Sequence, residues 1–270
     1  MIVDQDVPLE TNCYYNYAYI YGNKEIVRRI LQSNIDLYDR DEIGQCPIHY
    51  LARNDNDGVI DELYGKKFEV DALNNDGETP LNYAASAGLP YTVEFLLNNG
   101  AKPNTLNFYS RTPLSAAFSS AKYISVEDGT RYQDVVELLL KHGADPQLQP
   151  PGFEDIFETA LEYRLLVLLE SVISHLALLE KQGMAIISEH NARIINSHPI
   201  TSNFFKICRQ QLTKLETVKI NDSLTFYQLL ISSDTKIQQY ARDSNIISII
   251  RSICKNEEFY WPYGCKIQEF

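Results

Sequence analysis

The side chains with the chemistry for catalysis or metal binding are scattered along this chain without an ordered pattern. His142, His175, His190 and His198 show no ligand spacing with one another or with a cysteine, which argues against a metal site. Ser, His and Asp all occur, but nothing orders them into a triad, and neither a Gly-rich phosphate-binding loop nor a zinc-protease helix motif is found. The sequence therefore predicts no catalytic residues, no metal, no cofactor and no enzyme activity.

Residues suited to contacting another protein lie in three short segments, 39–42, 74–76 and 107–109. An exposed aromatic pair in the third segment suits a contact anchor, and carboxylates in the first suit a basic partner. The alternatives are an aromatic tip packed on its neighbour and an acidic segment that is simply solvated. The candidate partner-binding residues are Asp39, Arg40, Asp41, Asn75, Asp76, Phe108 and Tyr109.

Each segment precedes a phrase that returns every 33 residues. The phrase reads Cys46-Pro47-Ile48, then Thr79-Pro80-Leu81, then Thr112-Pro113-Leu114. A fixed period of this size predicts a solenoid of stacked helical pairs, and the Thr-Pro-Leu wording is typical of ankyrin repeats. Ankyrin arrays are nearly always binding surfaces, so the pattern favours a binding protein over an enzyme.

The third copy shows the physical reasons for the phrase. Thr79 can cap a helix by accepting a backbone N–H, and Pro80 suits the first helical position, where its missing donor costs nothing. Gly88 is expected to end this helix in a left-handed conformation, and a second helix over 92–97 closes at Gly100. Since one such unit cannot bury its own apolar side, stability must come from stacking on its neighbours.

The other copies depart from this pattern. Cys46 replaces the capping Thr, which should weaken that cap by about 1 kcal/mol. The second helix of that copy, near 59–63, is irregular. The fourth copy is ten residues longer, because Gly100 and Gly143 are 43 apart, and the extra residues lie near 119–132. This insertion is either a specificity loop projecting from one face or an unselected bulge.

These observations predict an all-α protein with an ankyrin-repeat solenoid of four to five helix pairs and a carboxy-terminal helical cap. The array fills 1–150, with a capping repeat at about 10–42 and repeats at about 43–75, 76–108 and 109–148. Residues 151–270 form a degenerate fifth repeat and further helices. Helices are expected over 157–163, 165–176 and 204–215, short helical segments near 226–230, 237–241 and 246–250, and a polar stretch at 190–201 with a loop around 197–199.

Composition limits the partners and the compartment. The net charge of −12 argues against nucleic acid and anionic membranes and matches a basic protein partner. The five cysteines are odd in number and scattered, which fits reduced thiols in the cytosol or nucleus. We expect no signal peptide, because the start lacks a basic region and an apolar core. The richest apolar run, 165–179, is too short to span a bilayer.

The carboxy-terminal part carries a family resemblance. Its elements include Ser188-Glu189-His190-Asn191, 223–230, Tyr240-Ala241-Arg242 and Trp261-Pro262-Tyr263. They look like the carboxy-terminal region of ankyrin proteins of parasitoid wasps and related insects. That region is itself similar to the PRANC domain of poxvirus ankyrin proteins.

The resemblance implies a function for the tail. In poxviruses the PRANC region resembles an F-box and docks on the adaptor subunit of a cullin ubiquitin ligase, while the ankyrin array holds the target. Here the motif would open at Trp261 and Pro262 and continue through Tyr263 to Ile267 and Phe270, in an abbreviated form. The alternative is a tail whose Trp ring packs on the last helices.

Three functional hypotheses follow. The first is a non-enzymatic interaction protein whose array binds a target and whose tail recruits a ubiquitin ligase. The second is an IκB-like inhibitor, acting in cytoplasm or nucleus, that masks a basic Rel-type transcription factor without degradation. The third is an enzyme hidden in the helical half. By the ankyrin resemblance, His49 is expected to bond across to the next turn and to be structural.

Overall fold

The computed structural model describes residues 24–33, 35–53, 58–123, 129–148, 155–221, 224–232, 234–240, 242–243 and 246–248. The chain divides into two compact units, Met1–Leu168 and Leu169–Phe270. The first, the repeat unit, holds the three segments with candidate binding residues. The tail residues Trp261, Pro262, Tyr263, Ile267 and Phe270 lie outside the described residues.

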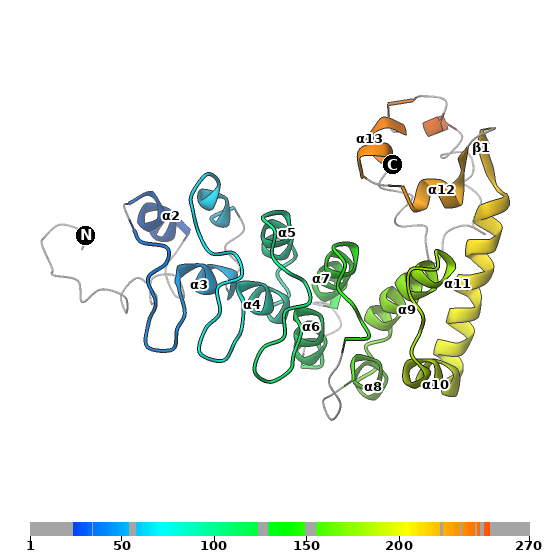
Figure 1. Cartoon of the computed structure of the whole chain (residues 1–270), viewed down its shortest axis with the longest axis horizontal. Helices are drawn as coiled ribbons and strands as arrows, with labels where there is room; N and C mark the ends of the chain where they lie inside the picture. The colour runs from blue at the N-terminus through cyan, green and yellow to red at the C-terminus, as the bar shows by residue number, and fades with distance from the viewer. Residues whose placement is uncertain are drawn as a thin grey trace, which may run out of the picture. The chain divides into compact units, whose positions relative to one another are not determined.

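The repeat unit is built from two rows of helices (Figure 1). Its elements are α2 (Lys24–Gln32), α3 (Pro47–Arg53), the 3-10 helix η1 (Ile60–Leu63), α4 (Pro80–Ser86), α5 (Pro90–Asn98), α6 (Pro113–Ala121), α7 (Gly129–Lys141) and α8 (Ile156–Glu162). Helices α3, α4, α6 and α8 pack in sequence as the inner row, and α2, η1, α5 and α7 as the outer row. The predicted all-α ankyrin solenoid is confirmed.

The inner helices begin and end as their sequences predict. Thr79 Oγ1 accepts the amide of Asn82 at 3.3 Å, and Thr112 Oγ1 accepts the amide of Ser115 at 3.1 Å. Gly88 has a φ of +65°, and the residue after it donates to the carbonyl of residue 84 at 3.1 Å. This is a Schellman ending, which satisfies the last carbonyls of α4.

The cap at Cys46 is different from the other two. The amide of His49 donates to the backbone carbonyl of Cys46 at 2.9 Å, so the side-chain oxygen that a Thr provides is missing, as predicted. The amide of Cys46, however, donates to His49 Nδ1 at 3.1 Å. The side chain of His49 therefore makes one of the two hydrogen bonds of a capping box, the one to the backbone amide of the N-cap residue. This bond was not predicted from the sequence.

Stacking in the inner row depends on small residues and buried rings. Ala84, Ala85 and Ala117 are fully buried, which allows the inner helices to approach closely. Phe118 and Phe157 fill the larger spaces and are also almost completely buried. Dense packing of this kind means that loss of even a methyl group costs stability.

The second unit contains most of α9 (Leu166–Lys181), then α10 (Glu189–Ser197), α11 (Pro199–Thr217), β1 (Lys219–Asn221), β2 (Leu224–Thr225), α12 (Phe226–Leu230) and α13 (Asp234–Tyr240). Most of the predicted polar stretch at 190–201 is helical, with a break only at His198. The two-stranded antiparallel sheet, with Lys219 opposite Thr225, was not predicted from the sequence.

Ion pairs join α9 to α11 in the second unit. Arg209 donates to both carboxylate oxygens of Glu180, at 2.9 and 2.5 Å, and its guanidinium lies 4.5 Å from the ring centroid of Phe205. Lys181 pairs with Glu216 at 2.8 Å. Among the described residues, no helix is long and apolar enough to cross a membrane, and no cluster of three His, Cys, Asp or Glu side chains could hold a metal.

The position that His49 occupies in α3 leads to a prediction for α4. Asn82, 33 residues later, is 2% exposed, and its Nδ2 has no partner among the described atoms. His49 Nε2 instead reaches the carbonyls of Ala72 and Glu78, at 3.0 and 3.2 Å. We predict that Asn82→His raises the free energy of unfolding by about 1 kcal/mol, because the longer ring reaches the equivalent carbonyls.

Urea unfolding of the full chain measures this change. The reciprocal variant His49→Asn is the matched control and should destabilise by about 1 to 2 kcal/mol, because it shortens the side chain that crosses to the next repeat. Stability unchanged or lowered by Asn82→His contradicts the prediction.

Candidate functional site

The candidate residues lie on three hairpin tips, defined as 39–44, 72–77 and 105–110, which project from the same edge of the repeat unit (Figure 1). Residues 33 apart occupy equivalent positions on successive tips. The first row of equivalent positions is Glu42, Asn75 and Phe108, the second is Ile43, Asp76 and Tyr109, and the third is Arg40, Leu73 and Leu106. The tips therefore present three parallel rows of side chains.

Each tip is folded by one Asp or Asn side chain. Asn107 Oδ1 accepts the amides of Tyr109 and Arg111, at 2.9 and 2.8 Å. Asn74 and Asp41 make the same pair of bonds on their own tips. The carboxylate of Asp41 also accepts the hydroxyl of Tyr50. Of the acidic residues predicted to bind a partner, Asp41 is thus engaged in folding its own tip.

Successive tips are joined by hydrogen bonds. Asn75 donates its amide to the carbonyl of Ile43 at 3.0 Å and its Nδ2 to the carbonyl of Glu42 at 3.0 Å. Phe108 donates its amide to the carbonyl of Asp76 at 2.9 Å. Each tip is therefore held by the one before it as well as by its own turn.

The aromatic pair of the third tip is exposed and also positioned. Phe108 is 74% exposed and Tyr109 is 55% exposed. The ring of Phe108 lies on Gly77, where an added Cβ would come within 2.8 Å of the ring. The hydroxyl of Tyr109 donates to Asp76 Oδ1 at 3.0 Å, and this hydrogen bond raises the pKa of Tyr109. Both rings thus present their free surface to solvent in a defined orientation.

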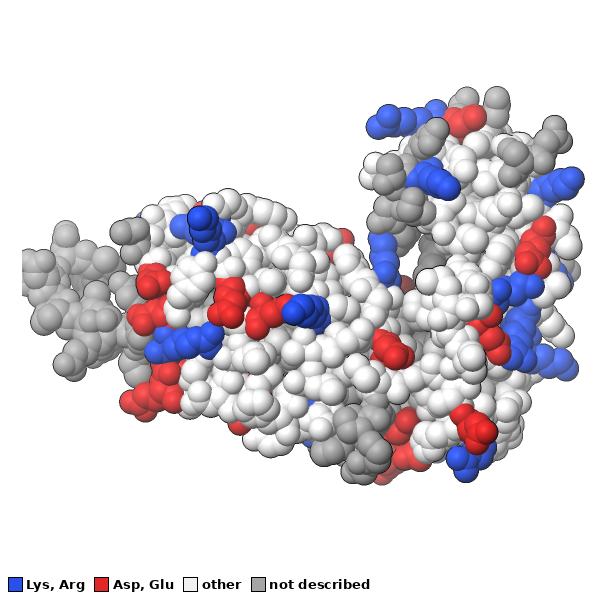
Figure 2. Space-filling view, in the orientation of Figure 1, with Lys and Arg blue, Asp and Glu red and all other residues white. Residues whose placement is uncertain are grey.

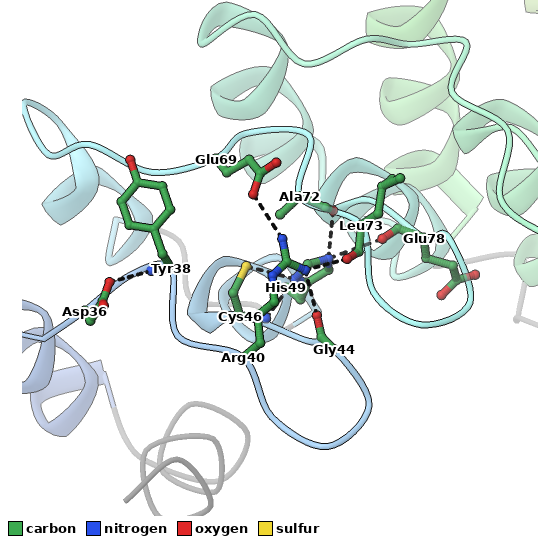
Figure 3. A network of polar contacts seen from close by, with 10 residues as sticks. All are labelled: Asp36, Tyr38, Arg40, Gly44, Cys46, His49, Glu69, Ala72, Leu73 and Glu78. Atoms are coloured by element: carbon green, nitrogen blue, oxygen red, sulfur yellow. Dashed lines mark hydrogen bonds and ion pairs between the residues drawn. The ribbon is translucent and has the colours of Figure 1, made fainter.

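Arg40 is used to join two repeats (Figure 3). Its Nη1 donates to the carbonyls of Gly44 and Leu73, at 3.0 and 2.5 Å, and its Nη2 donates to Glu69 at 3.0 Å. The guanidinium of Arg40 therefore makes at least three hydrogen bonds to other residues of the repeat unit. Leu73 and Leu106 occupy the same position on the next two tips, so this bridge occurs once among the three tips.

His49 forms the second polar connection between these repeats (Figure 3). Its Nδ1 accepts the amide of Cys46, which leaves Nε2 protonated in the neutral ring and able to donate to the carbonyls of Ala72 or Glu78. Burial lowers the pKa of His49 below its ordinary value of 6.5. The structural role predicted from the sequence is confirmed, since the ring reaches across to the next repeat.

Tyr83 links Gln45, which directly follows the first tip, to Asn74 of the second tip. Its hydroxyl accepts hydrogen bonds from Gln45 Nε2 at 2.6 Å and Asn74 Nδ2 at 3.1 Å. Burial, followed by the nearby charge of Glu78, raises the pKa of Tyr83 to about 12. The hydroxyl therefore stays protonated throughout the physiological range and fixes the relative position of two tips.

Each of the three tips also carries an exposed apolar side chain that was not predicted as a binding residue. Ile43, Leu73 and Leu106 are 54%, 46% and 40% exposed. The sequence contained a signal for two of them, because the 33-residue period places Leu73 and Leu106 at equivalent positions of successive tips. Their exposure on the same tips as the predicted binding residues favours a contact surface.

The acidic charge of the chain is concentrated in the repeat unit. Residues 1–168 hold 26 Asp and Glu against 13 Lys and Arg, whereas residues 169–270 hold 10 against 11. Figure 2 shows acidic side chains gathered over the amino-terminal repeats, while the same face further along the repeat unit is mostly uncharged. The negative charge on this face is thus concentrated toward the amino-terminal end of the repeat unit.

Comparison with known proteins agrees with this architecture. The family model for ankyrin repeats matches residues 15–107 and 48–150, which together cover half of the chain. The chain belongs to the ankyrin-repeat family. Ankyrin repeats bind protein targets and are typically non-enzymatic.

Relatives of the array occur in much larger ankyrin-repeat proteins. The chain is 31% identical over 130 residues to neurogenic locus notch homolog protein 2 of Homo sapiens, and 30% identical over 132 residues to notch homolog protein 1 of Danio rerio. It is 31% identical over 109 residues to transient receptor potential cation channel subfamily A member 1 of Homo sapiens. These matches cover 48%, 48% and 39% of the chain, but only 5%, 5% and 9% of the relatives.

The neutral state of His49 leads to a prediction of pH dependence. Since the pKa of His49 is lowered in the folded chain, the unfolded chain binds more protons between that value and 6.5. This contribution to stability is complete above about pH 6.5 and falls below it by up to about 1.4 kcal/mol per pH unit. Urea unfolding between pH 7.5 and 5 should show this loss.

The variant Cys46→Thr/His49→Asn is the matched control, because it copies the Thr79 and Asn82 pair of the next repeat. Its stability should fall less steeply with acidification than that of the parent. Identical slopes for the two proteins contradict the assignment of a neutral, buried His49.

The contact between Phe108 and Gly77 gives a second prediction. Gly77→Ala should cost at least about 2 kcal/mol, because the Cβ meets the ring and the backbone has a φ of +73°. Gly65→Ala is the matched control: its φ is +76°, but nothing lies within 4 Å of an added Cβ. It should cost about 1 kcal/mol. Equal losses in thermal unfolding would show that Phe108 does not pack on the tip.

Proposed function

We propose that the repeat unit binds a target protein through its hairpin tips, with Phe108 and Tyr109 as the principal anchors. The observation that carries this proposal is that both rings are exposed while neighbouring tip atoms fix their positions. Side chains that are ordered before binding lose little entropy when they bind, so they contribute more to affinity. Large aromatic residues in such positions are the usual hot spots of interfaces.

The hydrogen bonds of the tips suggest that most of the other candidate binding residues position the anchors and do not contact the target themselves. Asn75 donates to the preceding tip and so holds the second tip on the first, whereas Asp76 accepts the bonds from Phe108 and Tyr109 of the next tip. Substitution of either residue should therefore disturb the aromatic pair indirectly. Asp41 and Arg40 hold the first tip and the first junction. Asp39 remains a candidate for direct contact with the target.

The test is capture of the target by the full chain. A partner identified with the parent should bind the purified Phe108→Ser/Tyr109→Ser variant at least tenfold more weakly, since the main anchors are gone. Tyr123→Ser is the control, because Tyr123 is 81% exposed but lies outside the tips. A partner that binds both variants as tightly as the parent would overturn the proposal.

We further propose that the carboxy-terminal tail recruits the captured target to a cullin ubiquitin ligase. Support comes from the resemblance of Trp261, Pro262 and Tyr263, with Ile267 and Phe270, to an abbreviated F-box-like opening. The purified ligase adaptor should bind the parent and not the Trp261→Ala/Pro262→Ala variant. No binding by the parent would remove this part of the proposal and leave target binding by the array unaffected.

A second candidate function is IκB-like masking of a Rel-type transcription factor. The observation that favours it is the excess of acidic residues in 1–168, which suits a basic DNA-binding surface. In this case the chain should compete with DNA for a purified Rel domain, and the competition should weaken as salt is raised. Failure to displace DNA at low salt would exclude masking.

A further inference from the structure

The side chains of the first row change from charged to apolar along the array. The row begins with the carboxylate of Glu42, passes through the amide of Asn75 and ends with the ring of Phe108. All three side chains are exposed. A partner lying along this row therefore meets negative charge at one end and apolar surface at the other.

The apolar end is wider than one residue. Leu106 precedes Phe108 and Tyr109 on the same tip, and Leu73 lies at the equivalent position on the tip before. All four are at least 40% exposed. Because Phe108 and Tyr109 are held by Gly77 and Asp76, this patch keeps its shape without a partner.

The charge at the other end is available for a partner. The carboxylates of Asp39 and Glu42 make no hydrogen bond or ion pair to another described residue. Both residues are exposed. The carboxylate of Asp41, in contrast, accepts hydrogen bonds from the amide of Gln45 and the hydroxyl of Tyr50. Asp39 and Glu42 therefore supply charge complementarity to a cation without a cost to the fold.

The distance between the two ends sets the length of the partner. Stacked helices lie about 8 to 10 Å apart, so Glu42 and Phe108, two repeats apart, are separated by about 16 to 20 Å. An extended chain rises about 3.3 Å per residue, so about five or six residues cover this distance. Side chains an even number of residues apart project from the same face of an extended segment, so of these two lengths only six places both side chains toward the tips.

We propose, resting on the proposed function of the tips, that the target presents an extended segment with basic residues placed about six residues from a large apolar side chain. The basic residues pair with Asp39 and Glu42, and the apolar side chain packs on Phe108, Tyr109 and Leu106. The negative charge speeds association and fixes the direction of the segment, while the aromatic anchors supply most of the affinity.

The experiment uses the full chain and a labelled synthetic peptide followed by fluorescence anisotropy. The probe carries two arginines, the second of them six positions before a tryptophan, with glycine and serine between. Three control peptides replace the arginines by glutamates, replace the tryptophan by serine, or place it only three positions away. The parent should bind the probe in a saturable manner and each control peptide at least fivefold more weakly.

Two sets of variants test the contacts on the protein. Asp39→Lys/Glu42→Lys should weaken binding of the probe at least tenfold and abolish its sensitivity to salt. Glu94→Lys/Glu162→Lys changes the net charge equally at exposed residues outside the tips and should change affinity less than twofold. Phe108→Ser should weaken binding at least tenfold, and Tyr109→Phe should leave it within threefold, because the ring remains.

The outcomes separate this inference from the proposed function. No saturable binding of the probe, or binding that ignores the arginines or the tryptophan, overturns the inference about partner chemistry. If the natural target still depends on Phe108 and Tyr109, the proposed function stands without it. If substitution of both rings leaves the natural target bound, the proposed function fails and this inference fails with it.

Discussion

The hydrogen bond from the amide of one hairpin tip to a carbonyl of the preceding tip is the interaction on which the binding surface depends. Isolated loops of this length would sample many conformations, and their exposed side chains would lose entropy on binding. Here Asn75 and Phe108 donate to the tips before them, so the order of the helical stack extends into the loops. The surface is therefore a consequence of stacking.

The two junctions between the three tips reach this order by different means. The first uses polar side chains that cross between repeats, namely His49, Arg40 and Tyr83. The second has the shorter Asn82 in place of His49 and Leu73 in place of Arg40. It relies on packing of Phe108 on Gly77, on the hydrogen bonds from Tyr109 to Asp76 and from Asn107 to Glu78, and on the bond between Ser86 and Ser120 deeper in the repeat. The junction with fewer crossing polar bonds thus carries the aromatic anchors.

Much of the array follows from the sequence because the signals are local. A Thr before a Pro caps the helices α4 and α6, and Gly88 and Gly100 follow the ends of α4 and α5, so the positions of these helices could be predicted directly. Long-range contacts could not be read in this way. The guanidinium of Arg40, for example, reaches a carbonyl 33 residues away. The cap that His49 completes for Cys46 is local, but it was not predicted because His49 was expected only to bond across to the next turn. The sheet of β1 and β2 was missed because a strand of two or three residues has no periodicity to detect.

The most direct test of this account is amide hydrogen exchange at Asn75 and Phe108 in the unliganded full chain. If the tips are ordered by the stack, these two amides exchange with protection close to that of the inner helices α4 and α6, even though their side chains are exposed. Exchange as fast as in an unstructured loop would show that the tips are not fixed before binding. A preorganised surface for the target would then be contradicted.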